Sequence, residues 1–97
     1  MSEKEAKKEI MRRSHEINAT MHVGKEGLKE SVFEELNIQL KAHRIVKIKV
    51  LPSSESETKD IADALSKATN SVIVDTRGSV VILTDKRTWD SLSQKKF

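Results

Sequence analysis

Cysteine is absent from this 97-residue sequence, and no apolar run comes close to the length of a membrane span. Without cysteine the chain can form neither a disulfide framework nor a thiolate metal site. A bilayer span needs about 20 consecutive apolar residues, and the N-terminus is charged and helix-forming, unlike a secretory signal. The length is that of one domain. We therefore expect a single cytoplasmic domain with no membrane partner.

Aromatic residues are also scarce, at 3% of the sequence, so there is little material for an aromatic base-stacking platform. No residue pattern indicates an enzyme. The histidines His15, His22 and His43 fall on three different predicted elements, without the short spacings of a metal site. Asp60 and Asp63 fit the exposed side of a helix, and the serines show no arrangement typical of a catalytic triad. We therefore predict no catalytic residues, no bound metal and no cofactor.

Only three glycines and one proline occur, so each marks a break in the chain. Two glycines enclose the loop GKEG at residues 24–27. The third, Gly78, lies in the sequence TRGS between two β-branched runs, which predicts a hairpin. Pro52 follows an alternating stretch and predicts its end, because proline has no amide hydrogen to donate to a sheet.

Between these breaks the apolar residues repeat with the periods of helices and strands. Val46, Ile48 and Val50 alternate with lysines, which predicts a strand with one buried and one exposed face. The predicted elements are helix 3–18, strand 20–23, helix 28–43, strand 45–51, helix 54–69, and a hairpin of strands 72–75 and 80–84.

This α-β-α-β-α-β-β order predicts an α+β fold with a mixed four-stranded sheet and helices mainly on one face. A right-handed crossover places strands 20–23 and 45–51 parallel and adjacent, and the hairpin adds an antiparallel pair. Ser54 and Glu57 fit a capping box at the start of the third helix. We expect residues 1–87 to form the domain and residues 88–97 to form a polar, basic tail.

The net charge of +3 is too small to indicate a nucleic-acid partner, so the distribution of charge must decide. The glycines of GKEG have no side chains, so a phosphate could closely approach the backbone there. Lys25 and Lys29 lie on either side of the predicted helix start, where the first backbone amides favour anions. The GXXG loop of KH domains clamps a nucleic-acid backbone in this way. Glu26 opposes a phosphate contact unless it points away. An ordinary tight strand-to-helix turn remains an alternative.

A second basic feature is the stretch from residue 41 to residue 51, which contains no acid. Its cations are Lys41, Arg44, Lys47 and Lys49. Parallel pairing would bring Lys47 and Lys49 near His22 on the exposed face, and Arg12 and Arg13 would extend that surface. Such a groove would follow a phosphate backbone with strongly salt-dependent affinity. Lysines on the exposed side of a strand are also common without any ligand.

These features together resemble the CRM domain family, also called YhbY-like proteins (chloroplast RNA splicing and ribosome maturation). The matching segments are VGKEGL, LKAHRIVKIKV, SETKDIADAL and SVVILTDKR, and the resemblance covers roughly residues 5–87. It implies a fold similar to the C-terminal domain of bacterial translation initiation factor three. Stand-alone members of the family associate with precursor large ribosomal subunits, and plant members bind group II introns.

The resemblance implies a monomeric RNA-binding accessory protein that acts on ribosomal RNA during large-subunit assembly. Its contacts would come from the GKEG loop and neighbouring basic residues. The predicted RNA-binding set is Gly24, Lys25, Glu26, Gly27, Lys29, Arg12, Arg13, His22, Lys41, Arg44, Lys47 and Lys49. We expect recognition through backbone shape and charge, with weak sequence readout.

Two other classes of function stay open. The first is an Alba-type nucleic-acid or chromatin protein, for which we would expect a dimer and a basic hairpin loop. The short TRGS turn, with Arg77 alone, disfavours it. The second is a protein interaction module with no nucleic-acid role. We expect Trp89 to dock the tail on the core rather than to stack on bases. We expect the tail cations to be solvated, and added non-specific RNA affinity is the alternative for them; they are Lys86, Arg87, Lys95 and Lys96.

Overall fold

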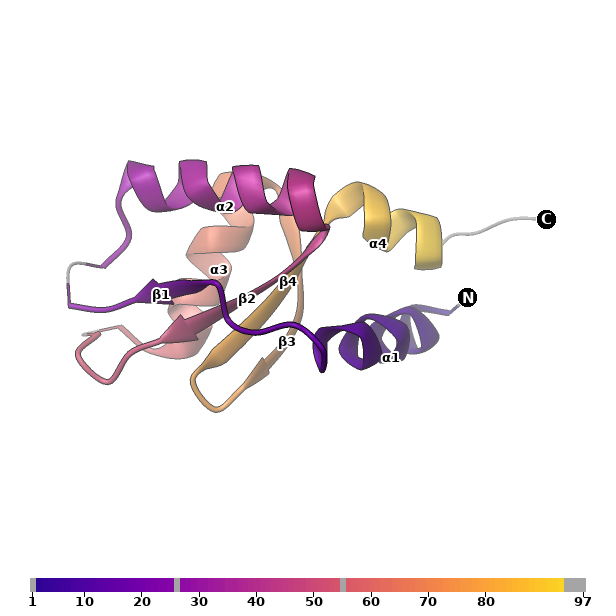
Figure 1. Cartoon of the computed structure of the whole chain (residues 1–97), viewed down its shortest axis with the longest axis horizontal. Helices are drawn as coiled ribbons and strands as arrows, with labels where there is room; N and C mark the ends of the chain where they lie inside the picture. Colours follow the sequence, from indigo (N-terminus) through magenta and orange to yellow (C-terminus); the bar gives the residue numbers. More distant parts are fainter. Residues whose placement is uncertain (1, 26, 55, 94–97) are drawn as a thin grey trace.

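The computed structural model describes residues 2–25, 27–54 and 56–93. These residues form four helices and four strands (Figure 1). The bounds are α1 Glu3–Ser14, β1 Met21–Val23, α2 Glu30–His43, β2 Ile45–Val50, α3 Thr58–Thr69, β3 Ser71–Arg77, β4 Val80–Asp85 and α4 Lys86–Ser93.

The four strands form one mixed sheet in the order β1-β2-β4-β3. Strands β1 and β2 are parallel, with Met21 opposite Ile48 and Val23 opposite Val50. Strand β4 runs antiparallel to both β2 and β3. The parallel neighbours, the final hairpin and the mixed four-stranded α+β fold expected from the sequence are therefore confirmed.

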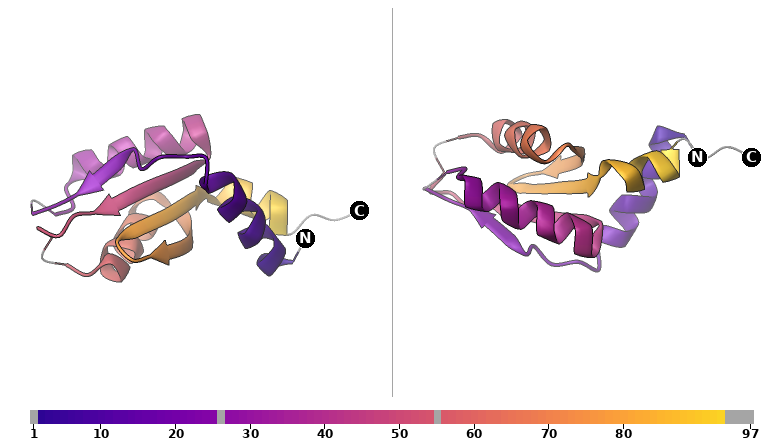
Figure 2. Two further views of the ribbon diagram at one scale, coloured as in Figure 1. Left: turned by 60° about the horizontal axis from the view of Figure 1, so that its bottom comes forward. Right: turned by 90° about the horizontal axis from the view of Figure 1, so that it is seen from above.

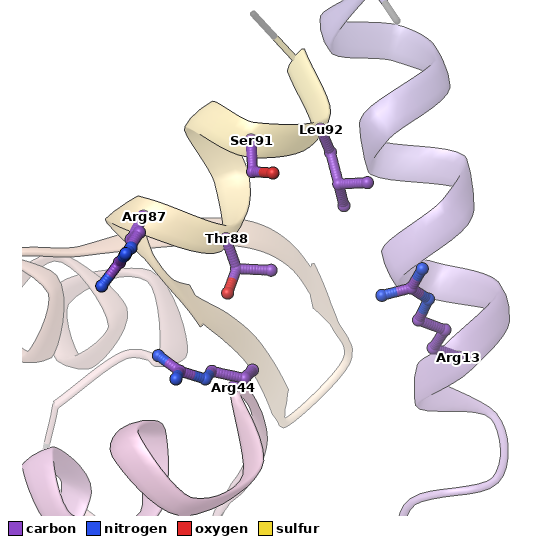
Figure 3. A pocket seen from close by; sticks show the side chains of 6 residues that line it. All are labelled: Arg13, Arg44, Arg87, Thr88, Ser91 and Leu92. Carbon is purple, nitrogen blue, oxygen red and sulfur yellow. The ribbon is translucent and has the colours of Figure 1, made fainter. Parts of the chain in front are cut away.

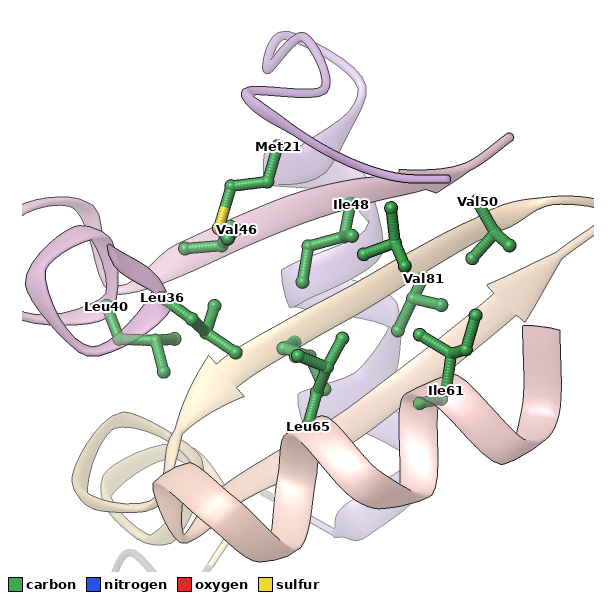
Figure 4. Packing of buried hydrophobic residues seen from close by; sticks show 12 residues of the cluster. Met21, Leu36, Leu40, Val46, Ile48, Val50, Ile61, Leu65 and Val81 are labelled. Carbon is green, nitrogen blue, oxygen red and sulfur yellow. The ribbon is translucent and has the colours of Figure 1, made fainter. Parts of the chain in front are cut away.

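Helices α2 and α3 cover one face of the sheet (Figure 4). Strand β2 turns Val46, Ile48 and Val50 toward them, because alternate residues of a strand point to the same face. Leu36 of α2 and Leu65 of α3 are fully buried in this core. Burial of each such leucine contributes roughly 2 kcal/mol. This layer holds the larger of the two hydrophobic cores.

Helices α1 and α4 pack over one end of the opposite face (Figure 2). Ile45 and Ile82, at the intervening strand positions, pack there with Ile10 of α1 and Trp89 of α4. Trp89 thus docks on a core, as expected. The sequence left the place of α1 open and did not predict α4, which crosses the boundary that we expected after residue 87. Within the residues that the structure describes, no helix covers the rest of this face.

The predicted capping box at the third helix is wrong. Helix α3 begins at Thr58, and its N-cap residue Glu57 makes no side-chain capping bond, while the Ser54 hydroxyl bonds locally to Ser56. A capping box instead starts α1, where the amide of Glu5 donates to the hydroxyl of Ser2 at 3.2 Å. The loop after Pro52 is therefore longer than the sequence pattern indicated.

Candidate nucleic-acid interface

The two glycines of the GKEG loop serve different structural needs. At Gly24 an added Cβ would lie 3.1 Å from the Ser53 hydroxyl oxygen and 3.2 Å from Leu51 Cδ1, so a side chain there would crowd the neighbouring loop. Gly27 has a φ of +71°, in the left-handed region that favours glycine. Its amide donates to the Gly24 carbonyl at 3.0 Å, which closes the turn. Glu26 lies outside the described residues.

Gly27 faces open space, because an added Cβ there would meet nothing within 4 Å. Lys25 and Lys29 are exposed beside it, and Lys29 is the N-cap residue of α2. The loop thus combines an accessible turn, two ammonium groups and a helix start, whose dipole favours anions. These are the physical features that a phosphate contact needs.

Strand pairing sets a row of basic side chains next to this loop. His22 is the register partner of Lys49, Lys49 is opposite Val80, and Val80 is opposite Arg77. Because partners across a sheet point to the same side, His22, Lys49 and Arg77 share the face that α2 and α3 do not cover. All three are exposed. We call the surface of His22, Lys47, Lys49 and Arg77 the open face.

Lys47 lies one row further along β2, opposite Ile82, and is half-buried. It lines a hollow of about 170 Å³ beneath α1, together with His15, Arg77 and apolar side chains. The stem of Lys47 therefore packs on apolar surface, while its ammonium group can reach solvent, as is common for lysine. Lys47 connects the row near the loop with the surface of α1.

Helix α1 extends the positive surface beyond Arg77. A groove of about 470 Å³ lies between α1 and β3. Its basic lining residues are Lys4, Lys7, Lys8, Arg12, His15 and Arg77. Asp75 is its acid, and it pairs with Lys7 at 3.9 Å and with Arg77 at 3.2 Å. The cations outnumber this acid, so the groove attracts anions.

Arg12 and Arg13 are neighbours in the chain but line different hollows. Arg12 lines the groove with Arg77, whereas Arg13 lines a hollow with Arg44 and Arg87. Both donate to Glu9, from Arg12 Nε at 3.3 Å and from Arg13 Nε at 3.0 Å. These hydrogen bonds, that from Arg12 first, hold the pKa of Glu9 below its ordinary value. Glu9 is the shared counter-charge of the two arginines.

The basic stretch of residues 41–51 does not stay together in space. Lys47 and Lys49 lie on the open face, whereas Lys41 is exposed on α2, the layer that covers the other face. Arg44 is the C-cap residue of α2, with a φ of +68°. Its guanidinium lies 3.6 Å from the carboxylate of Asp85. The structure therefore brings His22, Lys47 and Lys49 together, and separates them from Lys41 and Arg44.

Sequence reasoning left Arg77 and Arg87 out of the predicted site. The hairpin register places Arg77 opposite Val80, in the same cross-strand row as Lys49. The sequence did not predict this position, because β3 extends to Arg77, beyond the predicted strand 72–75. Arg87 was assigned to a solvated stretch because α4 was not predicted. The spacing of Trp89 and Leu92, three residues apart on one helix face, was the available signal for that helix.

None of the helices within residues 2–25, 27–54 and 56–93 is long and apolar enough to cross a membrane. In the same part of the chain, no three His, Asp or Glu side chains come together where they could hold a metal ion.

Comparison with known proteins identifies the family of this chain. The model of the CRS1/YhbY (CRM) domain matches residues 1–83, which is most of the chain. The chain belongs to the CRS1/YhbY (CRM) domain family. The resemblance drawn from the sequence is therefore confirmed, and the GKEG loop and the open face lie inside the matched region.

Relatives of this CRM domain protein are found in a bacterium and in an archaeon. The probable RNA-binding protein YqeI of Bacillus subtilis is 29% identical over 77 residues, which cover 79% of this chain and 80% of YqeI. A probable RNA-binding protein of Methanocaldococcus jannaschii is 31% identical over 93 residues, or 93% of this chain and 69% of that protein.

A solved structure supports the same fold. The solution structure of a hypothetical Staphylococcus aureus protein with a suggested RNA-binding role superposes with a TM-score of 0.72 at 26% identity. The match covers 89% of this chain and 90% of that one. The overall fold of this chain is therefore similar to that of an experimentally determined structure.

Proposed function

We propose that this protein binds the backbone of structured RNA through the GKEG loop and the open face. The observation that carries the proposal is the pairing of His22 with Lys49, which sets a basic row directly beside the glycine turn. Phosphate contacts by these groups would release counterions and make the affinity fall steeply with salt. The names of the relatives, which describe probable RNA-binding proteins, support the same class of ligand.

Backbone recognition is favoured over base stacking because the described aromatic side chains are used in the cores. Phe33 packs against the core under α2 and α3, and Trp89 packs against the core under α1 and α4. Stacking platforms for single-stranded RNA need aromatic side chains on an accessible surface. The open face presents lysine, arginine and histidine instead, which suit phosphate and sugar contacts.

We further propose that the protein is a non-enzymatic accessory factor that acts on ribosomal RNA during large-subunit assembly in the cytoplasm. The family resemblance supports this, because stand-alone CRM proteins associate with precursor large subunits. A monomer is supported by the surface: Ile38 is the large hydrophobic side chain exposed within the described residues, which leaves little apolar area there for a dimer. The family membership also argues against the Alba-type alternative.

The test is a salt series of binding to a structured ribosomal RNA fragment and to duplex DNA of equal length. Lys25→Glu should weaken RNA binding about tenfold at low salt and reduce the salt slope. Lys59→Glu, at an exposed position of α3, is the matched control and should change affinity little. If wild type and folded Lys25→Glu bind RNA with equal affinity, the proposed role of the loop is refuted.

The protein interaction module remains the competing function, and a separate experiment addresses it. Affinity purification from cells with and without RNase distinguishes the two. We expect ribosomal RNA and ribosomal proteins to be lost after RNase treatment. Recovery of one protein partner that resists RNase, from a chain that does not bind RNA in the salt series, would support the competing function instead.

A further inference from the structure

Three arginines from distant parts of the chain converge on one hollow (Figure 3). Arg13 comes from α1, Arg44 from the C-cap of α2 and Arg87 from the first turn of α4. The hollow has a volume of about 530 Å³, and Thr88, Ser91 and Leu92 complete its lining. Figure 3 shows Arg13 reaching from α1 toward the space that Arg44 and Arg87 border on the other side.

The hollow carries more positive than negative charge. Arg44 pairs with Asp85 at 3.6 Å, and Arg13 pairs with Glu9, which also holds Arg12. Arg87 has no carboxylate partner in the part of the chain that the structure describes. Among the described residues, one guanidinium of the hollow therefore has no carboxylate partner, and a second shares its carboxylate with Arg12. A singly charged phosphodiester matches this excess.

Hydrogen bonds between side chains and backbone hold the elements that border the hollow in place. The Arg44 carbonyl accepts hydrogen bonds from the Thr84 hydroxyl at 2.9 Å and from the Asp85 amide at 3.3 Å. The Asp85 carboxylate accepts from the Thr88 amide at 3.2 Å, at the start of α4. Asp85 thus joins the end of α2 to the start of α4. Such preorganisation lowers the entropy cost of binding an anion.

The hollow and the GKEG loop lie at opposite ends of β2. Arg44 directly precedes β2, whereas Gly24 follows the residue of β1 that pairs with Val50, the last residue of β2. Figure 1 shows the connection from β1 to α2 at one end of the molecule and α1 and α4 at the other. A strand of this length separates the two sites by roughly 20 Å.

We propose that the hollow of Arg13, Arg44 and Arg87 binds a second phosphate of the same RNA that contacts the GKEG loop. This inference rests on the proposed RNA-binding function and adds a second anchoring point to it. Guanidinium groups present paired donors that match two phosphate oxygens, and the hydroxyls of Thr88 and Ser91 offer further donors. Two anchors this far apart would favour RNA with a fixed shape over a flexible single strand.

The test uses Arg87→Gln and Arg13→Gln, which leave the Arg44–Asp85 pair intact. Lys86→Gln is the matched control, because Lys86 is exposed next to Arg87 and does not line the hollow. Each arginine variant should weaken binding to structured RNA about five- to tenfold at low salt. Each should also lower the salt slope by roughly 0.7 to 0.9 per lost phosphate contact. Circular dichroism and thermal unfolding confirm that each variant is folded.

The outcomes separate this inference from the proposed function. If wild type fails to bind structured RNA, the proposed function is wrong. If Lys25→Glu weakens binding while Arg87→Gln and Arg13→Gln behave like Lys86→Gln, only the second anchor is wrong. A further experiment titrates the protein with inorganic phosphate and monitors binding by NMR of the arginine Nε–H groups. Phosphate that saturates the hollow without competing with RNA would show that free phosphate, not RNA, is its ligand.

Discussion

His22 of β1 and Lys49 of β2 are register partners in the parallel part of the sheet. The GKEG loop begins two residues after His22, so the pairing sets both side chains beside the glycine turn. Arg77 joins the same row through β4. The basic side chains of this row therefore come from three strands, and their grouping depends on tertiary pairing as much as on any one segment.

Replacing Lys49 by glutamine should weaken binding to structured RNA and reduce the salt slope. Because one phosphate contact is lost, we expect a change of about fivefold at low salt and a slope smaller by roughly one. Lys67→Gln, exposed on α3, is the control. Fluorescence anisotropy across a salt series measures both quantities. The same loss in the two variants would mean that net charge alone, and not the open face, controls binding.

Gly27→Ala should destabilise the fold modestly and weaken RNA binding. The φ of +71° costs an alanine about 1 kcal/mol, although its Cβ would meet no atom. Gly78→Ala is a close match, because Gly78 has a φ of +56° and is equally open. Urea unfolding should give similar stability losses for both. RNA affinity should fall only for Gly27→Ala, and a comparable fall for Gly78→Ala would contradict a specific role of the loop.

Glu9→Gln should change how stability depends on pH. Arg12 and Arg13 lower the pKa of Glu9 in the folded state, so ionised Glu9 stabilises the fold at pH values above its ordinary, unfolded-state pKa. That contribution is lost as the pH falls through the lower folded-state pKa. Wild type should therefore exceed Glu9→Gln in stability near neutral pH, and the difference should shrink as the pH falls through the lowered folded-state pKa of Glu9.

Urea unfolding at several pH values measures this difference, and a gap that stays constant from neutral to acidic pH would contradict the assignment. The same variant should bind RNA more tightly at neutral pH. Glutamine removes the shared counter-charge, which leaves Arg12 and Arg13 with more positive potential for phosphate. Glu34→Gln, exposed on α2, controls for the general effect of one removed negative charge.

Trp89→Ala should destabilise the protein by about 2–3 kcal/mol, because a half-buried indole is lost from the core under α1 and α4. Lys86→Ala, at an exposed position of the same helix, should cost little. Under conditions where both variants are folded, the RNA affinity of Trp89→Ala should stay within about twofold of wild type, because Trp89 packs in the core and does not line the hollow. A large affinity loss without a stability loss would indicate base stacking instead.

The sequence alone indicated much of the fold because its local signals were strong. The alternation of Val46, Ile48 and Val50 predicted β2, and the β-branched runs around Gly78 predicted the hairpin. The right-handed crossover rule then placed β1 beside β2 in parallel. Helix α4 escaped prediction because its short apolar stripe, Trp89 and Leu92, is outnumbered by polar residues and gains stability only by packing against α1 and the sheet.

The sequence by itself determined where glycine permits a tight turn and which segments are basic, because glycine conformation and charge are properties of single residues. Only the tertiary structure decided which cations share a surface. Strand register joined His22 to Lys49 and Arg77, the end of α2 turned Arg44 away from Lys47, and α4 brought Arg87 to Arg13. Electrostatic attraction depends on distance in space, and chain separation carries little information about that distance once strands pair and helices pack.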